Sequence, residues 1–413
     1  MKVAVYINNN NNPSLTGSNT FAEEIINSFS TLVGGKHKFV FIISDHLEPT
    51  VCPNNIECYK IKDHFPQKQS KVVSQLRLRI ASLIKKICEK VYIDIPIKYT
   101  TSESYDEYDK YLKDREIAFE RIVDIHEIDI VLYSTMFDYP SVNIPFIQII
   151  WDVASCQYPY LKEFYQNDNV NRHYDIVGNA AKRAFRVITG NKVGAIEIHQ
   201  FYRIPEDRIR CIPFSVPKAL HCIEEIGIIV PEPYILYPSG FWKHKNHQVI
   251  IKAIAKLKEN NIILHAVFTG PDNGNTERLT SYIEQYGINE QVHCLGLVSN
   301  EELKYLYKNA EALVFPSILG PNNFPPIEAL SLGCLPIISD IPGHREQMGE
   351  HALYFDPFDH THLADLLYKI LQDTKLKDNI LSNRDVLLEH ISSESYVQRL
   401  MDVVDEYELY THL

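Results

Sequence analysis

The segment PSILGPNNFPPIEALSLGCLPIISD, residues 316–340, places a single carboxylate, Glu328, at the start of a short apolar run. Pro325 and Pro326 suit the first turn of a helix, where a missing N–H costs nothing. We therefore expect a helix to begin here, with Glu328 in its first turn. The amino terminus of a helix attracts anions, and a carboxylate beside it can accept two hydrogen bonds from a cis-diol. The segment thus predicts a site that holds a phosphate and a ribose.

Bulk composition narrows the class of protein that carries this segment. The chain has 413 residues, 45% of them apolar and 23% charged, which is typical of a soluble globular protein of two or three domains. A net charge of −12 disfavours a partner made of nucleic acid, because such proteins usually present a basic surface. Eight scattered cysteines without a CxxC pair indicate free thiols, and no apolar run is long enough to span a membrane. We expect a cytoplasmic protein.

The elements that must position the site alternate between strand and helix patterns. A buried strand at residues 2–7, a helical pattern at 20–32 and a second strand at 38–44 predict a βαβ unit and hence a parallel sheet. A second alternating series runs from residue 234 to 339, after a proline-rich stretch at 213–233. We predict an amino-terminal domain, a carboxyl-terminal domain, and a last helix that packs back on the first domain, with bounds at 1–218, 219–390 and 391–413.

Residues 68–90 form a basic amphipathic segment within an otherwise acidic chain. It has two interpretations. The segment is either a surface helix with its apolar face in the core, or an interfacial helix that contacts anionic lipid. The second interpretation predicts peripheral attachment to the inner face of a membrane.

The stretch GPNNFPPIEALSLGCLPII resembles the donor motif of retaining glycosyltransferases of the GT-B fold, family 4, in a subset with a GPTNxPPLEA-like form. The resemblance implies an α/β protein in which two Rossmann-like, doubly wound domains face each other across a cleft. It also implies that Glu328 binds the donor ribose. The first glutamate of the family motif, which contacts the donor sugar, falls on Gly320. The resemblance assigns four residues to the sugar pocket: Asn322, Asn323, Phe324 and Pro325.

Two further stretches resemble the phosphate-binding parts of the same family. In YPSGFWKHKNHQVIIKAIAKL, Lys245 falls on the lysine that grips the diphosphate, and Gly240 falls on the family's arginine. We expect Lys243 to replace the charge of that arginine. FTGPDNGN supplies a glycine loop through Gly270, and in SLTGSNTFAEEI the resemblance implies that Gly17 lets the donor phosphates approach the first helix.

On the acceptor side, IQIIWDVASCQYP resembles the block that often carries His-Asp near the anomeric carbon. Trp151 stands at the histidine and Asp152 at the aspartate. The resemblance places Asp152 with Lys245 and Glu328 in the catalytic set, and Trp151 beside the acceptor. The alternatives are that Asp152 only caps a strand end and that Trp151 is a core residue.

The resemblance implies an enzyme that moves a hexose from a nucleotide sugar, with retention, to a hydroxyl of a surface-polysaccharide, lipopolysaccharide or lipid-linked glycan acceptor. We expect mannose from GDP-mannose as the donor. No cofactor and no metal ion are expected, because in this fold basic side chains and a helix dipole stabilise the diphosphate. Two alternatives remain open: a UDP-sugar-dependent transferase of the same fold, and a catalytically impaired protein that only binds nucleotide sugars.

Overall fold

A computed structural model describes the chain over residues 1–7, 24–25, 28–29, 35–44, 56–61, 102–134, 141–165, 171, 173–217, 220, 224 and 226–412. For residues 102–109, 111, 112 and 374 it describes only the backbone. Gly17 and the basic segment 68–90 lie outside the described residues, so the predictions made for them stay predictions.

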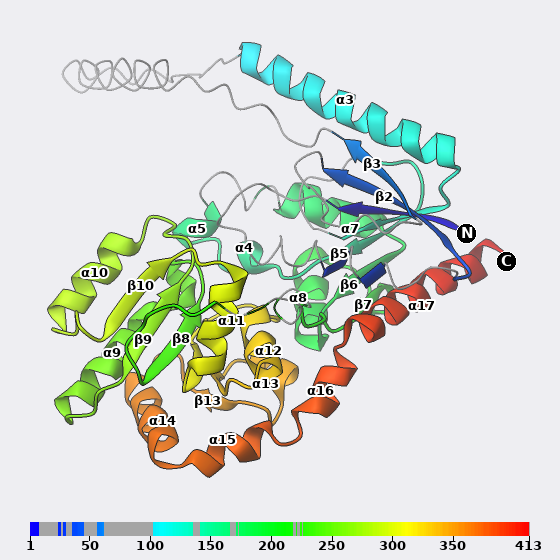
Figure 1. Cartoon of the computed structure of the whole chain (residues 1–413). Helices are drawn as coiled ribbons and strands as arrows, with labels where there is room; N and C mark the ends of the chain where they lie inside the picture. Colours follow the sequence, from blue (N-terminus) through cyan, green and yellow to red (C-terminus); the bar gives the residue numbers. More distant parts are fainter. Residues whose placement is uncertain are drawn as a thin grey trace, which may run out of the picture.

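The first sheet has seven parallel strands in the order β3-β2-β1-β4-β5-β6-β7 (Figure 1). The first strand lies in the interior of the sheet and later strands are added outward on both sides, which is the order of a doubly wound α/β fold. The strands are β1 (Lys2–Ile7), β2 (Lys38–Ser44), β3 (Glu57–Ile61), β4 (Ile130–Tyr133), β5 (Phe146–Ile149), β6 (Arg186–Thr189) and β7 (Ile209–Cys211). Among the described residues of this half, the helices with defined bounds are α3 (Ser102–His126), α4 (Ala154–Gln157), α5 (Lys162–Tyr165), η3 (His173–Gly178), α7 (Asn179–Arg183), α8 (Lys192–Tyr202) and η4 (Glu206–Arg208).

The second sheet repeats the arrangement with six parallel strands in the order β10-β9-β8-β11-β12-β13. The strands are β8 (Tyr234–Pro238), β9 (His265–Thr269), β10 (Val292–Gly296), β11 (Ala312–Phe315), β12 (Pro336–Ser339) and β13 (Leu353–Phe355). The helices are η6 (Lys243–Lys245), α9 (His247–Glu259), α10 (Thr276–Gln285), α11 (Asn300–Asn309), α12 (Phe324–Ser331), α13 (Pro342–Met348), α14 (His360–Gln372), α15 (Thr374–Leu381), α16 (Arg384–His390) and α17 (Ser393–Thr411). Two doubly wound sheets, as the sequence predicted, are thus confirmed.

Strand β1 shows why these sequences form buried parallel strands. Its side chains alternate between two cores: Val3, Val5 and Ile7 belong to one, and Ala4 and Tyr6 to the other. Helices cover both faces of a parallel sheet, so a strand that is apolar on both sides is stable only in its interior. The same continuous apolar pattern in β11 and β12 buries every residue of those two strands.

Helix α17 follows the second sheet in sequence and packs on the first one (Figure 1). Tyr396, Val397 and Leu400 share a core with the residues of β1 that face it. Farther along the helix, Glu406 accepts hydrogen bonds from Arg186 of β6 and from Arg210 of β7, the latter at 2.7 Å. The last helix therefore ties the end of the chain to the amino-terminal half.

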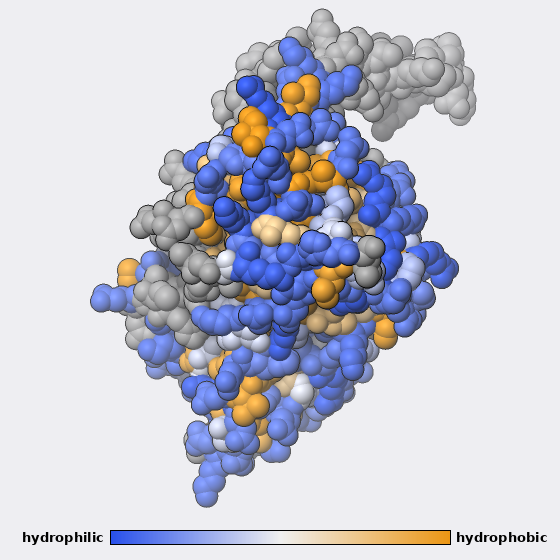
Figure 2. All heavy atoms as spheres, turned by 90° about the vertical axis from the view of Figure 1, so that its right-hand side faces the viewer, coloured by the Kyte–Doolittle hydropathy of each residue, from blue (hydrophilic) through white to orange (hydrophobic). Residues whose placement is uncertain are grey.

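From the side on which α17 lies, the described surface is mostly hydrophilic, with small and separate apolar patches (Figure 2). Within the described parts of the chain, no helix combines the length and the apolar character needed to cross a bilayer.

We expect Leu400→Ala to lower the free energy of unfolding by about 2–5 kcal/mol, because it removes a side chain that is only 1% exposed and leaves a cavity in the core beneath α17. Leu409→Ala is a matched control on the same helix, since Leu409 is 70% exposed and its loss should change stability by no more than about 0.5 kcal/mol. Urea unfolding of both variants measures the difference. Equal effects would contradict the packing of α17 on the first sheet.

Candidate functional site

The loop between β11 and α12, residues 316–323, is called the donor loop here; together with α12 it carries five of the residues that the sequence predicted for the donor, namely Asn322, Asn323, Phe324, Pro325 and Glu328. Helix α12 starts at Phe324, with Pro325 and Pro326 in its first turn, as expected from the sequence. The two prolines remove two N–H groups from the turn that was expected to bind an anion. This helix start therefore offers fewer donors than an ordinary one, and positive charge near it must come from side chains.

Glu328 is the fifth residue of α12, so the prediction that placed it in the first turn was wrong. Its side chain instead lies one turn inside, where it is buried against α11 and accepts a hydrogen bond from the Tyr307 hydroxyl at 2.7 Å. Burial raises the pKa of Glu328 to about 7, although the hydrogen bond from Tyr307 opposes the rise. A carboxylate held in this way gains from any further hydroxyl that donates to it.

Lys245 lies at the end of η6 and reaches across to the donor loop. Its Nζ is 3.4 Å from Oδ1 of Asn323 and 5.1 Å from the centre of the Phe315 ring. The Tyr237 hydroxyl fixes the backbone there by donating to the Lys245 carbonyl at 2.6 Å. Burial lowers the pKa of Lys245 to about 8, and the negative charge of Asp152 opposes this shift. The ammonium is therefore poised to gain from a bound anion.

Sequence reasoning missed His344, which orients Asn323. Burial lowers the pKa of His344 to about 4, so the imidazole is neutral. Nδ1 lies 2.9 Å from the Ser339 carbonyl, an acceptor, so we assign the ring proton to Nδ1. Nε2 then accepts from the Asn323 side-chain amide at 3.0 Å, which turns the Asn323 oxygen toward Lys245. The signal available in the sequence for this residue was the histidine of the stretch IPGHREQ.

Asn322 and Phe324 lie at the junction of the two halves. A Cβ added to Gly190 would come within 2.5 Å of Oδ1 of Asn322, so Asn322 packs directly against the end of β6. Its Nδ2 is buried and has no hydrogen-bond partner among the described residues. The Phe324 ring stacks on Phe214 at 6.1 Å and touches the cores of both halves. Pro325, half-buried in the first turn of α12, follows it.

The backbone requires glycine at Gly270, which belongs to the predicted donor-binding set, and at Gly320, which stands where the family motif has its first glutamate. Gly270 has φ +131°, and a Cβ there would lie 2.6 Å from the Ser239 carbonyl oxygen. Gly320 has φ +104°, a conformation that residues with a Cβ rarely adopt. A glutamate at position 320 would strain this loop. The path of the loop therefore requires glycine where the family motif has its first glutamate. At Gly240 a Cβ would lie 2.5 Å from the Asn273 side chain, which an arginine would have to displace.

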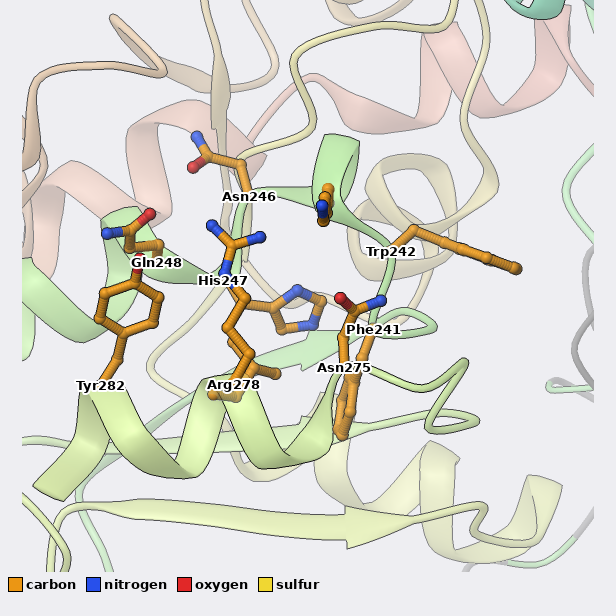
Figure 3. A pocket seen from close by; sticks show the side chains of 10 residues that line it. Phe241, Trp242, Asn246, His247, Gln248, Asn275, Arg278 and Tyr282 are labelled. Carbon is orange, nitrogen blue, oxygen red and sulfur yellow. The ribbon is translucent and has the colours of Figure 1, made fainter. Parts of the chain in front are cut away.

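Lys243 is not brought together with Lys245. It is exposed and lines a small cavity of about 50 Å³ between η6 and α10, whose lining includes neither Lys245 nor Glu328 (Figure 3). Figure 3 shows Arg278 rising from α10 toward Asn246 in this cavity. The placement gives no support to the prediction that Lys243 replaces the charge of the family's arginine.

Asp152 follows β5 at the carboxyl end of the first sheet. Its Oδ1 accepts from the amide of Ala154, the first residue of α4, at 2.8 Å. Its negative charge also acts on Lys245 of the other half. It acts as well on Glu197 of α8, where burial raises the pKa to about 7 and the charge of Asp152 adds to the rise. Glu197 is a second carboxyl group that the sequence reasoning missed. Trp151 is half-buried against both cores of the first sheet, as a core residue would be.

Two contacts join the halves beside the donor loop. Asn191 caps α8 by accepting from the Gly194 amide and donates to the Pro321 carbonyl at 2.6 Å. The Glu346 carboxylate accepts from the backbone amides of Lys192 and Val193, at 2.8 and 2.9 Å. The start of α8 is therefore held by the half that carries the donor loop.

Among the described residues, the group that could hold a metal ion is His37, Asp405 and Glu408. Lys36 already pairs with both carboxylates, and these residues belong to the β2 and α17 region, not to the donor loop.

Residues 223–384 match the family model described as "Glycosyl transferases group 1". The O-antigen chain mannosyltransferase RfbU of Salmonella typhimurium is 32% identical over 180 residues, which are 44% of this chain and 49% of that protein. The serotype-specific mannosyltransferase WbdA of Escherichia coli is 27% identical over 282 residues, 63% of this chain and 34% of that protein. The chain thus spans about half or less of the length of these relatives.

Among solved structures, sucrose-phosphate synthase from Thermosynechococcus elongatus is similar to the whole chain. The TM-score is 0.71 at 15% identity, covering 99% of this chain and 100% of that one. Together with the two parallel sheets, this similarity shows that the chain has the GT-B fold, and residues 223–384 of its carboxyl-terminal half are the segment similar to the group 1 glycosyl transferases.

Proposed function

We propose that this protein is a retaining transferase that moves a hexose, mannose from GDP-mannose, to a hydroxyl of a surface-polysaccharide, lipopolysaccharide or lipid-linked glycan. The observation that carries the proposal is a half-buried ammonium, Lys245, beside Asn323 at the start of α12, together with a buried carboxyl group, Glu328, one turn into the same helix. The names of the relatives RfbU and WbdA, both mannosyltransferases, support the choice of sugar and of a glycan acceptor.

Lys245 holds the donor diphosphate in this proposal. The phosphate oxygens gain negative charge as the bond to the sugar breaks, so a cation fixed in a poorly solvated site stabilises the transition state more than the ground state. The α12 amino terminus adds its dipole, although its prolines leave it few N–H donors. Asn323 fixes the position of the ammonium and is itself fixed by His344.

Glu328 accepts the two ribose hydroxyls in this proposal. The Tyr307 hydroxyl already uses one lone pair of Oε2, and a carboxylate offers about four acceptor positions. Hydroxyl donors favour the ionised form, so ribose binding would lower the raised pKa of Glu328.

In the chemical step, the bond from the anomeric carbon to the phosphate oxygen breaks, and the acceptor oxygen bonds to that carbon from the same face. The acceptor proton passes to the departing phosphate oxygen, so no enzymic nucleophile is needed. Asp152 lies within electrostatic range of Lys245, from the opposite half. Its negative charge stabilises positive charge that develops at the anomeric carbon, or it orients the acceptor hydroxyl.

The first experiment is a thermal-shift panel of GDP, UDP, ADP and dTDP with the wild type, Glu328→Ala and Glu350→Ala. A nucleotide at 100 times its dissociation constant should stabilise the wild type by about 2.7 kcal/mol. We expect GDP to stabilise the wild type and the control Glu350→Ala, whose altered residue is exposed, but to stabilise Glu328→Ala much less. A response to UDP instead would select the UDP-sugar alternative. No response to any nucleotide would refute the donor site.

The two shifted pKa values predict that nucleotide affinity has a maximum between about pH 7 and pH 8. As the pH falls below about 7, Glu328 becomes protonated and ceases to accept from both ribose hydroxyls. As the pH rises above about 8, Lys245 becomes neutral and loses its attraction for the diphosphate. Nucleotide binding therefore releases a proton below about pH 7 and takes one up above about pH 8. On each limb of the profile, the acid limb and the alkaline limb, the affinity falls by up to about tenfold per pH unit. Calorimetric titration across this range measures both limbs.

Two variants separate the limbs of this profile. Tyr307→Phe removes the hydrogen bond that favours the Glu328 carboxylate, so it should move the acid limb to higher pH. Lys245→Arg keeps its charge at every pH of the experiment and should flatten the alkaline limb. An acid limb that does not move in Tyr307→Phe would show that Glu328 does not cause it.

A further inference from the structure

Helix α5 belongs to the amino-terminal half and lies at the boundary with the carboxyl-terminal half (Figure 1). Its Glu163 carboxylate accepts two hydrogen bonds from His244 of η6, one from the backbone amide and one from Nδ1, both at 3.1 Å. The side chains of Glu163 and His244 are only 5% and 10% exposed. The neighbouring Phe164 ring stacks on the imidazole at 5.5 Å. The contact is therefore almost inaccessible to water, and it joins the two halves.

The ionisation of this pair follows from its geometry. A carboxylate only accepts hydrogen bonds, so the proton of the His244 ring lies on Nδ1. Burial would raise the pKa of Glu163, but hydrogen bonds from the ring and backbone of His244 outweigh it and hold the pKa at about 2. Burial, reinforced by the nearby charge of Lys245, lowers the pKa of His244. We therefore treat the pair as a carboxylate held by two N–H donors of a neutral histidine.

His244 connects this contact to the donor site on two sides. Its carbonyl accepts from the Ile318 amide at 3.0 Å, and Ile318 belongs to the loop between β11 and α12. Its sequence neighbour is Lys245, whose own carbonyl is held by Tyr237 and whose Nζ reaches Asn323. A displacement of His244 would thus move both the lysine and the loop that it contacts.

We propose that Glu163 is a positioning residue of the donor site: when the two halves are closed, its carboxylate fixes His244 and thereby places the Lys245 ammonium beside Asn323. Closure of the halves and correct placement of the lysine then depend on the same pair of hydrogen bonds. Only the assignment of a diphosphate to Lys245 rests on the proposed function. The dependence of the Lys245 position on Glu163 does not.

The test compares Glu163→Ala, Glu163→Gln and the control Glu120→Ala, which alters an exposed residue of α3 on the outer side of the first sheet (Figure 1). Competitive amine labelling without nucleotide, read by mass spectrometry, gives the labelling of Lys245 relative to the exposed Lys243. We expect this ratio to rise at least about threefold in Glu163→Ala, because loss of the contact lets water reach the amine. The ratio should stay near that of the wild type in Glu163→Gln, whose amide oxygen can accept both hydrogen bonds.

The second readout is steady-state kinetics with the nucleotide sugar identified by the thermal-shift panel. Loss of placement in Glu163→Ala should lower kcat/KM at least about tenfold, with most of it restored in Glu163→Gln and none lost in Glu120→Ala. A labelling ratio unchanged in Glu163→Ala, or equal losses of kcat/KM in the Ala and Gln variants, would overturn the proposal. Failure of the wild type to bind any nucleotide would refute the proposed function instead, while the labelling ratio would still test the role of Glu163.

Discussion

The ammonium of Lys245 is withdrawn from water far enough for burial to lower its pKa to about 8, and the surrounding structure is arranged to keep it there. An isolated buried cation is expensive, so such a group needs fixed partners. The amide of Asn323 and the ring of Phe315 supply two, and the charge of Asp152 supplies a third from the other half. These partners leave the pKa below its usual value, which means that the charge is only partly compensated. A bound diphosphate would supply the negative charge that is lacking, so an ammonium with partly compensated charge makes the site suited to an anion.

Support for that ammonium comes from residues that touch no ligand in the proposed function. The neutral imidazole of His344 sets the direction of the Asn323 amide. Gln347 adds a reciprocal pair of hydrogen bonds with the Asn323 backbone, at 3.2 and 2.8 Å. Both residues come from α13, which also sends Glu346 to the start of α8. One short helix therefore orients the donor loop and holds the opposite half.

At the boundary, each half places one carboxylate against N–H groups of the other half. Glu346 gives two acceptor oxygens to backbone amides at the start of α8, and Glu163 gives its carboxylate to a backbone amide and a ring N–H in η6. Such directional bonds form only at fixed distances and angles, so they define how the two halves lie against each other in this structure. Gly320 belongs to the same picture, because its positive φ gives the donor loop a path that a glutamate there would strain.

The sequence by itself determined the two doubly wound sheets, because strands that are apolar on both faces, separated by amphipathic helices, are stable only in that arrangement. It also placed the start of α12 correctly, since Pro325 and Pro326 are tolerated in a first turn. The resemblance of two stretches to a family motif indicated that Glu328 and Lys245 matter, but not how they are held. Only the tertiary structure decided that Glu328 lies one turn inside the helix against Tyr307, that Lys243 faces a separate cavity, and that His344 and Glu163 reach the site. These contacts join residues from different elements, and their hydrogen bonds and desolvation depend on distances that no local pattern in the chain encodes.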